Sequence, residues 1–539
     1  MKFELLLSTA LFTFACSDSG GPAEPSRDAA VPADLAIAPS ASKLPILQGT
    51  TATIDVTVTR LPGHDGVVVV EPVGLPAGVA FDPLTIDAGA TTGTLVLRAD
   101  AAAAHSLPTT VQLRGTLGTS TASTEITVTV YGPPGSLDTS FGGGKLMIPA
   151  GASDDFANAV AVQADGKLVI AGRGAEHLGD FALIRLDRDG QLDATFGTNG
   201  RVLTDFAGTS ETIFAIAIQP DGKIVAAGTT TRAGTSNDFA VARYLPNGEL
   251  DPSFGSGGKV VTALGTDSDT AYALALQPDG KLVVGGDSNR GSSQTGVDFA
   301  LVRYTAAGAL DTTFGTSGVV LTPIASNGAR DSIYALALQA IDGETRIVAA
   351  GGEGDFTIAR YRDNGALDAS FGNGGTVANL FGSTIGAARA ITVTPSGAIA
   401  VAGHAQHDVA LAQLTSAGAL DPFFGSGGKL TTRVSTTNFD EAQAIAVDTG
   451  GKLLVAGWVY EGASSAGNFV LLRYLTDGQR DPSFGNAGLV ITPVAAGSKA
   501  DQAMAIAIQD DDRVPTHRVI TAGFASVTNS DFAVTRYWR

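Results

Sequence analysis

The chain has 539 residues, of which 44% are hydrophobic and 16% charged, and its formal net charge is −19. Nucleic acid and anionic lipid surfaces would repel such a chain, so we expect no nucleic-acid partner. The 68 glycines and the scarcity of charge favour many short strands and turns over long surface helices. The composition therefore predicts an all-β protein.

The first residues have the layout of an export signal. An apolar run at residues 5–15 follows Lys2 and precedes Cys16, the single cysteine of the chain. The run is too short to span a bilayer and fits the apolar core of a signal peptide. The segment resembles a bacterial lipoprotein signal, although Thr13 and Glu4 depart from the usual pattern.

This resemblance implies that residues 1–16 are a signal segment and that Cys16 becomes the lipidated first residue of the mature chain. The alternatives are ordinary secretion with cleavage nearby and an incidental cysteine. We expect an exported protein that is anchored by lipid at the bacterial cell envelope, at the outer membrane or cell surface, and that touches the membrane only through this anchor.

Residues 17–33 are rich in Gly, Pro, Ser and Ala and predict a flexible tether. Residues 34–132 then alternate between apolar and polar positions and predict a β-sandwich of six or seven short strands. We expect strands at 51–59, 66–70, 78–81, 93–98, 109–114 and 124–130. The segments 74–81 and 86–90 resemble bacterial Ig-like surface domains, which usually act as spacers.

Everything after Pro134 repeats. The phrase Leu-Asp-x-x-Phe-Gly, or a close variant, occurs seven times at intervals of 53 to 60 residues. Between two such phrases come an Ala-x-Ala-x-Gln strand, a Pro-Asp-Gly-Lys turn, an apolar strand that ends in Ala-Gly, a variable loop and the strand Asp-Phe-Ala-x-x-Arg-Tyr. Four short antiparallel strands in each of seven units predict a seven-bladed β-propeller at residues 135–539.

The two ends of the repeat region complement each other. It begins with a turn and a fourth strand at residues 137–148, and it ends after a third strand at residues 531–537. The last blade therefore lacks its own fourth strand. We expect the first strand to complete it, so that pairing of the N- and C-terminal strands closes the ring and leaves no exposed sheet edge.

Together, the Gln-Pro-Asp-Gly-Lys, Asp-Phe-Ala-x-x-Arg-Tyr and Leu-Asp-x-x-Phe-Gly phrases resemble the delta-60 repeat family of bacterial surface and secreted proteins. The resemblance covers residues 135–539. It implies a β-propeller fold, and it implies no common activity that could be carried to this chain.

Two sets of acids recur at strand starts. The inner acids begin the first strands, where Gly386 is the exception: Asp155, Glu211, Asp269, Asp331, Asp440 and Asp501. The outer acids begin the third strands, where Asn468 is the exception: Asp180, Asp238, Asp298, Asp355, Asp408 and Asp531. These carboxylates either form two rings that bind a cation such as Ca²⁺ or accept backbone N–H bonds in their own loops, and repetition in every blade favours the second interpretation.

An arginine near the end of each third strand, replaced once by Gln413, is predicted to pair with the Asp of the following Leu-Asp turn as a structural pin. The arginines are Arg185, Arg243, Arg303, Arg360, Arg473 and Arg536. The turn acids are Asp138, Asp193, Asp251, Asp311, Asp368, Asp421 and Asp481. For the closing blade the pair is Arg536 with Asp138. An anion site is the alternative.

Two smaller groups are weaker candidates. His404, His407 and Asp408 are too few for a firm Zn²⁺ site, and we expect an exposed polar loop there. Trp458 and Tyr460 are expected in a long variable loop, where they either stack on a sugar or pack the loop down, and we favour packing.

The chain contains no Gly-x-Ser-x-Gly, His-Glu-x-x-His or phosphate-loop motif. We therefore predict a non-catalytic, monomeric cell-surface binding or scaffold module that uses the variable-loop face of its propeller to bind a glycan or an envelope protein. The alternative is a hydrolase or lyase that acts on an extracellular polymer. No cofactor is expected, with calcium left open.

Overall fold

The computed structural model describes residues 34–539 apart from 175–178, 207–209, 232–235, 266, 290–295, 325–330, 383–384, 436–438, 461–466, 496, 498–499 and 512–516. The predictions for Cys16, for residues 1–16 and for residues 17–33 lie outside the described residues. In the described ranges no helix is long and apolar enough to cross a membrane. One short 3₁₀ turn, η1 (Gly142–Gly144), accompanies 37 strands there.

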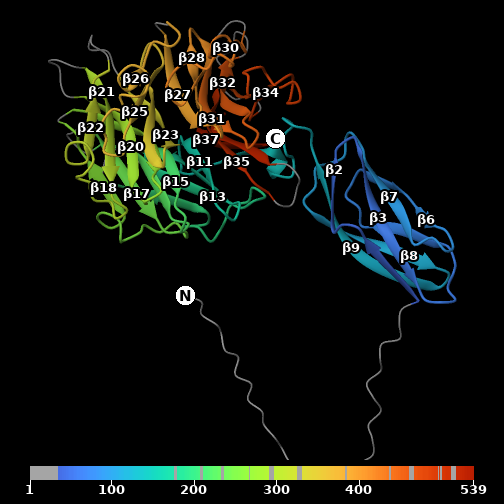
Figure 1. Ribbon diagram of the computed structural model, residues 1–539. Coiled ribbons are helices and arrows are strands. Elements are labelled where there is room, and N and C mark those ends of the chain that lie inside the picture. Colours follow the sequence, from blue (N-terminus) through green and yellow to red (C-terminus); the bar gives the residue numbers. More distant parts are fainter. Residues whose placement is uncertain are drawn as a thin grey trace, which may run out of the picture.

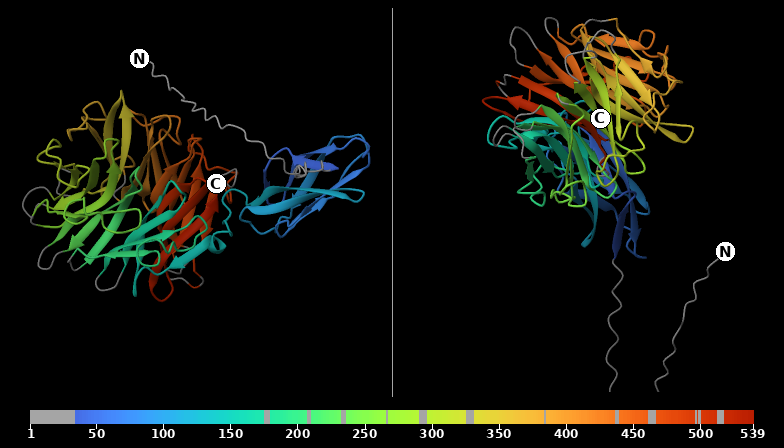
Figure 2. Two further views of the ribbon diagram at one scale, coloured as in Figure 1. Left: turned by 90° about the horizontal axis from the view of Figure 1, so that it is seen from below. Right: turned by 90° about the vertical axis from the view of Figure 1, so that its left-hand side faces the viewer.

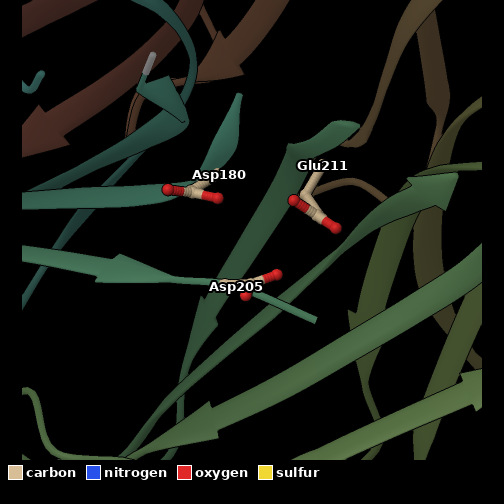
Figure 3. Close-up of side chains that lie close together, drawn as sticks. All are labelled: Asp180, Asp205 and Glu211. Atoms are coloured by element: carbon tan, nitrogen blue, oxygen red, sulfur yellow. The ribbon is translucent and has the colours of Figure 1, made fainter. Parts of the chain in front are cut away.

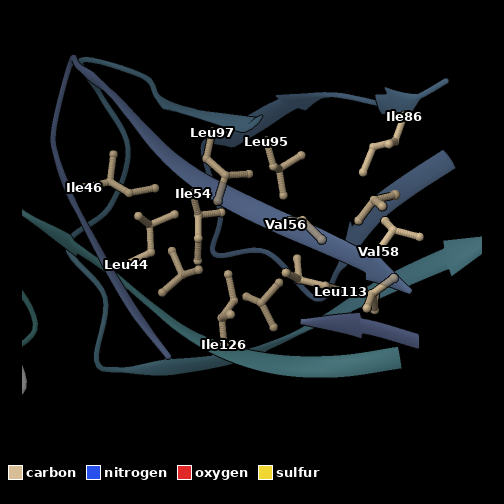
Figure 4. Packing of buried hydrophobic residues seen from close by; sticks show 14 of the residues in the cluster. Leu44, Ile46, Ile54, Val56, Val58, Ile86, Leu95, Leu97, Leu113 and Ile126 are labelled. Carbon is tan, nitrogen blue, oxygen red and sulfur yellow. The ribbon is translucent and has the colours of Figure 1, made fainter. Parts of the chain in front are cut away.

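The N-terminal part is a β-sandwich of two sheets around one apolar core (Figure 4). Val56, Leu97, Val111 and Val128 are fully buried between the sheets because alternate residues of their strands point inward. One sheet has the order β1 (Leu35–Pro39), β3 (Thr51–Arg60), β7 (Thr92–Ala99) and β5 (Val79–Asp82). The other has the order β2 (Lys43–Leu47), β9 (Ser120–Tyr131), β8 (Thr109–Leu117), β4 (Val68–Val73) and β6 (Leu84–Ile86).

All six strands expected in this part of the sequence are present. The strands β1, β2 and β6 were not predicted, because they are three to five residues long and each of them contains or adjoins a proline. β2 pairs with β9 in parallel, whereas the other pairs in this sandwich are antiparallel.

The C-terminal part consists of seven four-stranded antiparallel sheets, counted over the described ranges. Each sheet follows chain order from its first strand outward, except that the last one takes its fourth strand from the start of the region. The first six sheets are β11–β14 (Phe156–Val162, Leu168–Gly174, Asp180–Leu186, Arg201–Thr204), β15–β18 (Ser210–Ile218, Ile224–Thr231, Asn237–Tyr244, Lys259–Thr262), β19–β22 (Asp269–Leu276, Leu282–Asn289, Val297–Tyr304, Val319–Thr322), β23–β26 (Ile333–Ile341, Glu344–Gly351, Thr357–Tyr361, Thr376–Val377), β27–β30 (Gly386–Val393, Ile399–Ala405, Asp408–Leu414, Lys429–Thr432) and β31–β34 (Asp440–Val447, Leu453–Tyr460, Gly467–Tyr474, Leu489–Thr492).

The seventh sheet joins the two ends of the repeat region. It contains β35 (Ala500–Gln509), β36 (Arg518–Ser526), β37 (Ser530–Trp538) and, on its outer edge, β10 (Lys145–Ile148). β10 and β37 pair antiparallel, with Lys145 opposite Thr535 and Ile148 opposite Phe532. The expected pairing of N- and C-terminal strands is therefore present, and the teal β11 lies beside the red β35 in Figure 1.

The first strands of the seven sheets contact one another in cyclic order, and β11 meets β35 to complete the ring (Figures 1 and 2). Apolar clusters fill the space between neighbouring sheets. In one of them Val169 and Leu183 pack against Ile224 and Ala240 of the next sheet. The second and third strands are buried on both faces for this reason, and their apolar runs show no alternation.

Candidate functional site

Every first strand carries a β-bulge at the same place. The register shifts by one residue within each pairing of a first strand with its second strand, as it does between Ala157 and Ala159. The extra residue of a bulge is re-aimed relative to its strand. The seven extra residues, called channel residues below, are Asn158, Phe214, Tyr272, Tyr334, Arg389, Gln443 and Met504.

A glycine stands opposite each bulge. Gly172 pairs with Ala157, and a Cβ atom there would lie 1.9 Å from the carbonyl oxygen of Phe156. The corresponding glycines of the other sheets meet a carbonyl at 1.8 to 1.9 Å: Gly228, Gly286, Gly351, Gly403, Gly457 and Gly523. The Ala-Gly phrase of the repeat thus provides the space that the bulge needs, and it is the sequence signal from which the channel residues could have been found.

The channel residues surround a cavity of about 310 Å³ at the centre of the ring. A second hollow of about 230 Å³ shares all seven and continues along the two residues that follow each of them. The volume of the cavity lies at the small end of the range for ligand pockets, and the volume of the second hollow lies below that range. Unlike the turns and pins, the channel residues differ from sheet to sheet, so the cavity has no rotational symmetry in its chemistry.

Three neighbouring channel residues form an aromatic arc. The ring centroids of Phe214 and Tyr272 lie 5.1 Å apart at 62°, and those of Tyr272 and Tyr334 lie 5.2 Å apart at 51°. The guanidinium carbon of Arg389 lies 4.3 Å from the Tyr334 ring centroid. These edge-to-face and tilted ring contacts restrain each ring, so the arc is pre-organised before a ligand arrives.

Arg389 is held from behind by Glu441. Arg389 Nε donates to Glu441 Oε1 at 2.7 Å, and His404 Nδ1 lies 3.1 Å from the same oxygen. Burial alone would raise the pKa of Glu441, but the neighbouring His404 and Arg389 outweigh it and lower that pKa. The only charged channel residue is therefore already compensated by a buried carboxylate.

The histidine segment differs from the expected exposed polar loop. His404 lies on β28 and is only 7% exposed, because β31 covers it with the carboxylate of Glu441. Phe439 packs against both His404 and His407 with centroids 4.9 Å away. The expectation of exposure is wrong for His404, whereas His407 is exposed.

Trp458 and Tyr460 lie on strand β32, so their expected position in a long loop is wrong. Trp458 is 8% exposed, stacks on Phe439 at 5.6 Å and contacts Tyr460 at 4.9 Å. The indole therefore packs within the protein, which was the favoured interpretation, and offers no open face for a sugar.

The inner acids are buried and do not crown the ring. Asp155, Asp269, Asp440 and Asp501 are fully buried, Glu211 is 2% exposed and Asp331 is 5% exposed. The carboxylates of Asp155, Asp269, Asp440 and Asp501 accept backbone N–H bonds from the preceding loop. Asp155 Oδ2 accepts from Ala150 and Gly151, both at 2.8 Å, and Asp440 Oδ2 accepts from Val434 at 2.7 Å and Ser435 at 2.8 Å.

The outer acids divide into two groups. Asp238, Asp298 and Asp355 are buried, and Asp180, Asp408 and Asp531 are half-buried. Asp355 accepts from the backbone N–H of Phe356 at 2.7 Å and of Phe381 at 3.0 Å. Local hydrogen bonding, which was the favoured interpretation of the recurring acids, thus accounts for these members of both sets.

Among the described residues, one group of three acids combines an inner acid and an outer acid with a third carboxylate. Asp180, Asp205 and Glu211 can each direct a carboxylate oxygen to within 4.8 Å of the other two (Figure 3). Asp205 follows β14 and was not singled out in the sequence, because it belongs to no recurring phrase. A calcium ion takes six to eight oxygen ligands. Binding of calcium by the inner and outer acids stays a prediction.

Each predicted pin arginine lies against the predicted aspartate. The shortest distances between the guanidinium and carboxylate atoms are 2.9 Å for Arg185–Asp193, 2.8 Å for Arg243–Asp251, 2.9 Å for Arg303–Asp311, 2.9 Å for Arg360–Asp368, 2.9 Å for Arg473–Asp481 and 2.8 Å for Arg536–Asp138. Gln413 Nε2 donates to Asp421 Oδ2 at 2.9 Å in the remaining sheet.

Further contacts of the pins were not predicted. Each arginine stacks on the phenylalanine of its Leu-Asp-x-x-Phe turn, as Arg243 does on Phe254 with 4.7 Å between guanidinium carbon and ring centroid. A lysine from the Pro-Asp-Gly-Lys turn can also approach this aspartate, as Lys223 does at 3.3 Å from Asp251. The hydroxyl of Thr313 is the main reason why the pKa of Asp311 falls to about 2. The charges of the pin arginines and turn aspartates are therefore paired within the scaffold.

The pins also join neighbouring sheets. Arg243 Nη1 donates to the Ala306 carbonyl of the following sheet, and Arg536 Nη1 donates to the Arg188 carbonyl across the closure. In the other direction Tyr304 donates its hydroxyl hydrogen to Thr262 Oγ1 of the preceding sheet at 2.7 Å. Burial raises the pKa of Tyr304, so this hydroxyl keeps its proton.

Five stretches of the chain, residues 163–196, 219–254, 277–314, 341–371 and 451–484, match the model of a family described as a domain of unknown function (DUF5122) beta-propeller. Each match runs from the turn after a first strand to the phenylalanine of the Leu-Asp-x-x-Phe turn. No curated protein matches the chain.

Two solved structures with similarity to the chain are a DUF4784 family protein from Bacteroides caccae and the D1–D4 ectodomain fragment of ICAM-5. The first is 11% identical, covers 93% of this chain and 95% of its own, and has a TM-score of 0.21. The second is 10% identical, covers 94% and 98%, and has a TM-score of 0.16.

Proposed function

Because the chain is built on β-propeller repeats, we propose that it is a non-catalytic binding module that takes its ligand into the central channel of a seven-bladed propeller. An Ig-like sandwich and the tether at residues 17–33 act as the spacer, and lipidation of Cys16 anchors the module at the cell envelope. The channel replaces the variable-loop face as the site that we favour within this function.

The channel residues carry this proposal. The repeat keeps the same residue type wherever the scaffold needs it, as in the pins and the glycines opposite the bulges. At the bulge it presents seven side chains with no common type. Non-repeating side chains on a repeated frame are typical of positions that contact a ligand, since the frame gains nothing from their diversity.

Binding is favoured over hydrolysis by the chemistry of the channel residues. Glycoside hydrolysis usually uses a pair of carboxylic acids on the two sides of the scissile bond. None of the seven channel residues is an acid, and Glu441 behind them is committed to Arg389 and His404. A hydrolase or lyase stays the alternative function, and it would need its acids on another surface.

A thermal-shift screen with matched variants tests the proposal. Small molecules, peptides and oligosaccharides are screened against the wild-type protein, Tyr272→Ala and Phe423→Ala. Phe423 is a suitable control because it is 86% exposed and does not line the channel cavity. A ligand whose stabilisation is lost in Tyr272→Ala and kept in Phe423→Ala supports the channel. If every ligand stabilises Tyr272→Ala as much as it stabilises the wild-type protein, the channel is not the binding site.

A further inference from the structure

We infer that the channel ligand is a small neutral saccharide that stacks on the aromatic arc and hydrogen-bonds to the polar side of the cavity. This inference rests on the proposed binding function and adds the chemical class of the ligand. The size, the charge and the polarity of the channel carry it, and each of these restricts the ligand separately.

The size of the channel excludes a folded partner. A cavity of about 310 Å³ accepts a mono- or disaccharide or a single side chain, and it is too small for a helix or a protein loop. The channel residues are half-buried and stay accessible in this cavity. A ligand of this size would contact most of the seven at once.

The charge of the channel favours a neutral ligand. Arg389 is the only charged channel residue, and its side chain, which is 27% exposed, is paired with Glu441 at 2.7 Å. An anionic ligand would have to compete with this buried carboxylate for the guanidinium. A cation would meet the guanidinium itself beside the aromatic arc, where the two positive charges repel.

The distribution of polarity matches the two kinds of surface on a sugar. A pyranose has apolar C–H faces, which pack on aromatic rings, and hydroxyl edges, which need donors and acceptors. Phe214, Tyr272 and Tyr334 supply the aromatic arc on three successive first strands. Next around the ring come Arg389 and Gln443, whose planar groups donate in fixed directions.

The polar groups are available or already positioned. Asn158 donates its amide hydrogen to the Ile213 carbonyl at 2.9 Å, which fixes the orientation of its side chain toward the arc's first strand. Within the described part of the chain no hydrogen bond engages the Gln443 amide. Since this amide is both donor and acceptor, it suits a hydroxyl that must play both roles.

The test is an array of neutral and acidic glycans, probed with the full-length protein in calcium and again in chelator. Neutral glycans that bind are then measured by calorimetry with Tyr272→Ala, Tyr272→Phe, Gln443→Ala and the control Phe423→Ala. We expect Tyr272→Ala to weaken binding about tenfold through loss of stacking. Tyr272→Phe keeps the ring and should retain most of the affinity, which also covers the case in which the alanine variant folds poorly.

Three patterns of binding would overturn the inference. They are exclusive binding of acidic glycans, neutral-glycan binding that is unchanged in Tyr272→Ala and Gln443→Ala, and binding that is lost in chelator but kept in both variants. The last would place the site at the acids near the strand starts. An array on which no glycan binds would also overturn the inference that the ligand is a saccharide. The proposed channel function survives it only if some other ligand from the thermal-shift screen depends on Tyr272.

Discussion

Asp138 and Arg536 come from opposite ends of the repeat region and meet at 2.8 Å with both side chains fully buried. Arg518 Nε approaches the same carboxylate oxygen to 2.6 Å, and Asp138 N donates to the Arg536 carbonyl at 2.8 Å. Burial would raise the pKa of Asp138, but Arg536 and Arg518 outweigh it and lower that pKa. The closure of the ring therefore depends on an ion pair as well as on strand pairing.

Replacing Asp138 by Asn should destabilise the protein by about 3 to 5 kcal/mol, because the buried Arg536 loses its counter-charge and the buried Arg518 keeps only Asp511 as an ionic partner. Asp421→Asn is the matched control, since the partner of Asp421 is the neutral Gln413. Urea unfolding followed by circular dichroism gives both values. Equal losses in the two variants would contradict an ionic role for Asp138.

A chain that starts at residue 150 lacks β10 and leaves the edge of β37 unpaired. We expect it to lose the single cooperative thermal transition, while a chain that starts at residue 133 keeps it. Differential scanning calorimetry on the two chains distinguishes them. Unchanged cooperativity in the shorter chain would count against closure as a condition for stability.

The tyrosine contacts between sheets predict a non-additive pair. Tyr304→Phe leaves the buried hydroxyl of Thr262 without its donor and should cost about 1 to 3 kcal/mol. Adding Thr262→Val removes that orphaned group, so the double variant should be more stable than the sum of the single changes. Strict additivity in the unfolding free energies would show that this hydrogen bond contributes nothing.

The glycine opposite a bulge offers a test of how the channel is built. Gly286→Ala would place a Cβ atom 1.8 Å from the Thr270 carbonyl oxygen, so the bulge that presents Tyr272 must shift, at about 1 to 3 kcal/mol. Gly285→Ala is the control, because alanine stands there in the other sheets and its Cβ meets only side-chain atoms at 3.0 Å or more. Both variants are compared by urea unfolding and by near-ultraviolet circular dichroism.

The two glycine variants should differ in both measurements. The near-ultraviolet circular dichroism signal of the aromatic arc should change in Gly286→Ala and should be unchanged in Gly285→Ala. The opposite order of effects would mean that the bulges are not what positions the channel residues.

The sequence predicted those features that depend on spacing. The order of the repeated phrases predicted four strands per unit, and the missing fourth strand of the last blade predicted the pairing of Arg536 with Asp138. Spacing cannot show burial, so a cation-binding ring stayed open as an alternative for the inner acids. In the structure, loop N–H groups donate to Asp155 and Asp440.

The channel residues were missed for a related reason. A strand that alternates Ala-x-Ala predicts two regular faces, whereas the bulge after Ala157 inserts Asn158 outside that alternation. The compensating signal, Gly172, lies on the neighbouring strand and has meaning only once the register is known. Sequence period alone therefore located the scaffold of the ring and not its candidate site.

The contact between the sandwich and the ring predicts a dependence on pH. His105 Nδ1 accepts hydrogen bonds from Trp538 Nε1 and from the Thr139 backbone N–H, both at 3.2 Å. Burial is the main cause that lowers the pKa of His105; Arg518 lowers it further, and Asp138 opposes this. The unfolded chain therefore binds a proton at His105 more readily than the folded chain does.

Because the pKa of His105 is lower in the folded state, its contribution to stability is present above the ordinary value of 6.5 and is lost as the pH falls below it. His105→Asn keeps an acceptor near the Nδ1 position and does not titrate. We expect the unfolding free energy of the wild-type protein to fall more steeply than that of the variant between pH 7.5 and about 5. Parallel profiles would mean that this contact does not sense protons. A steeper loss in the wild type, together with a change in Trp538 fluorescence in a Trp458→Phe background, would assign the effect to this junction.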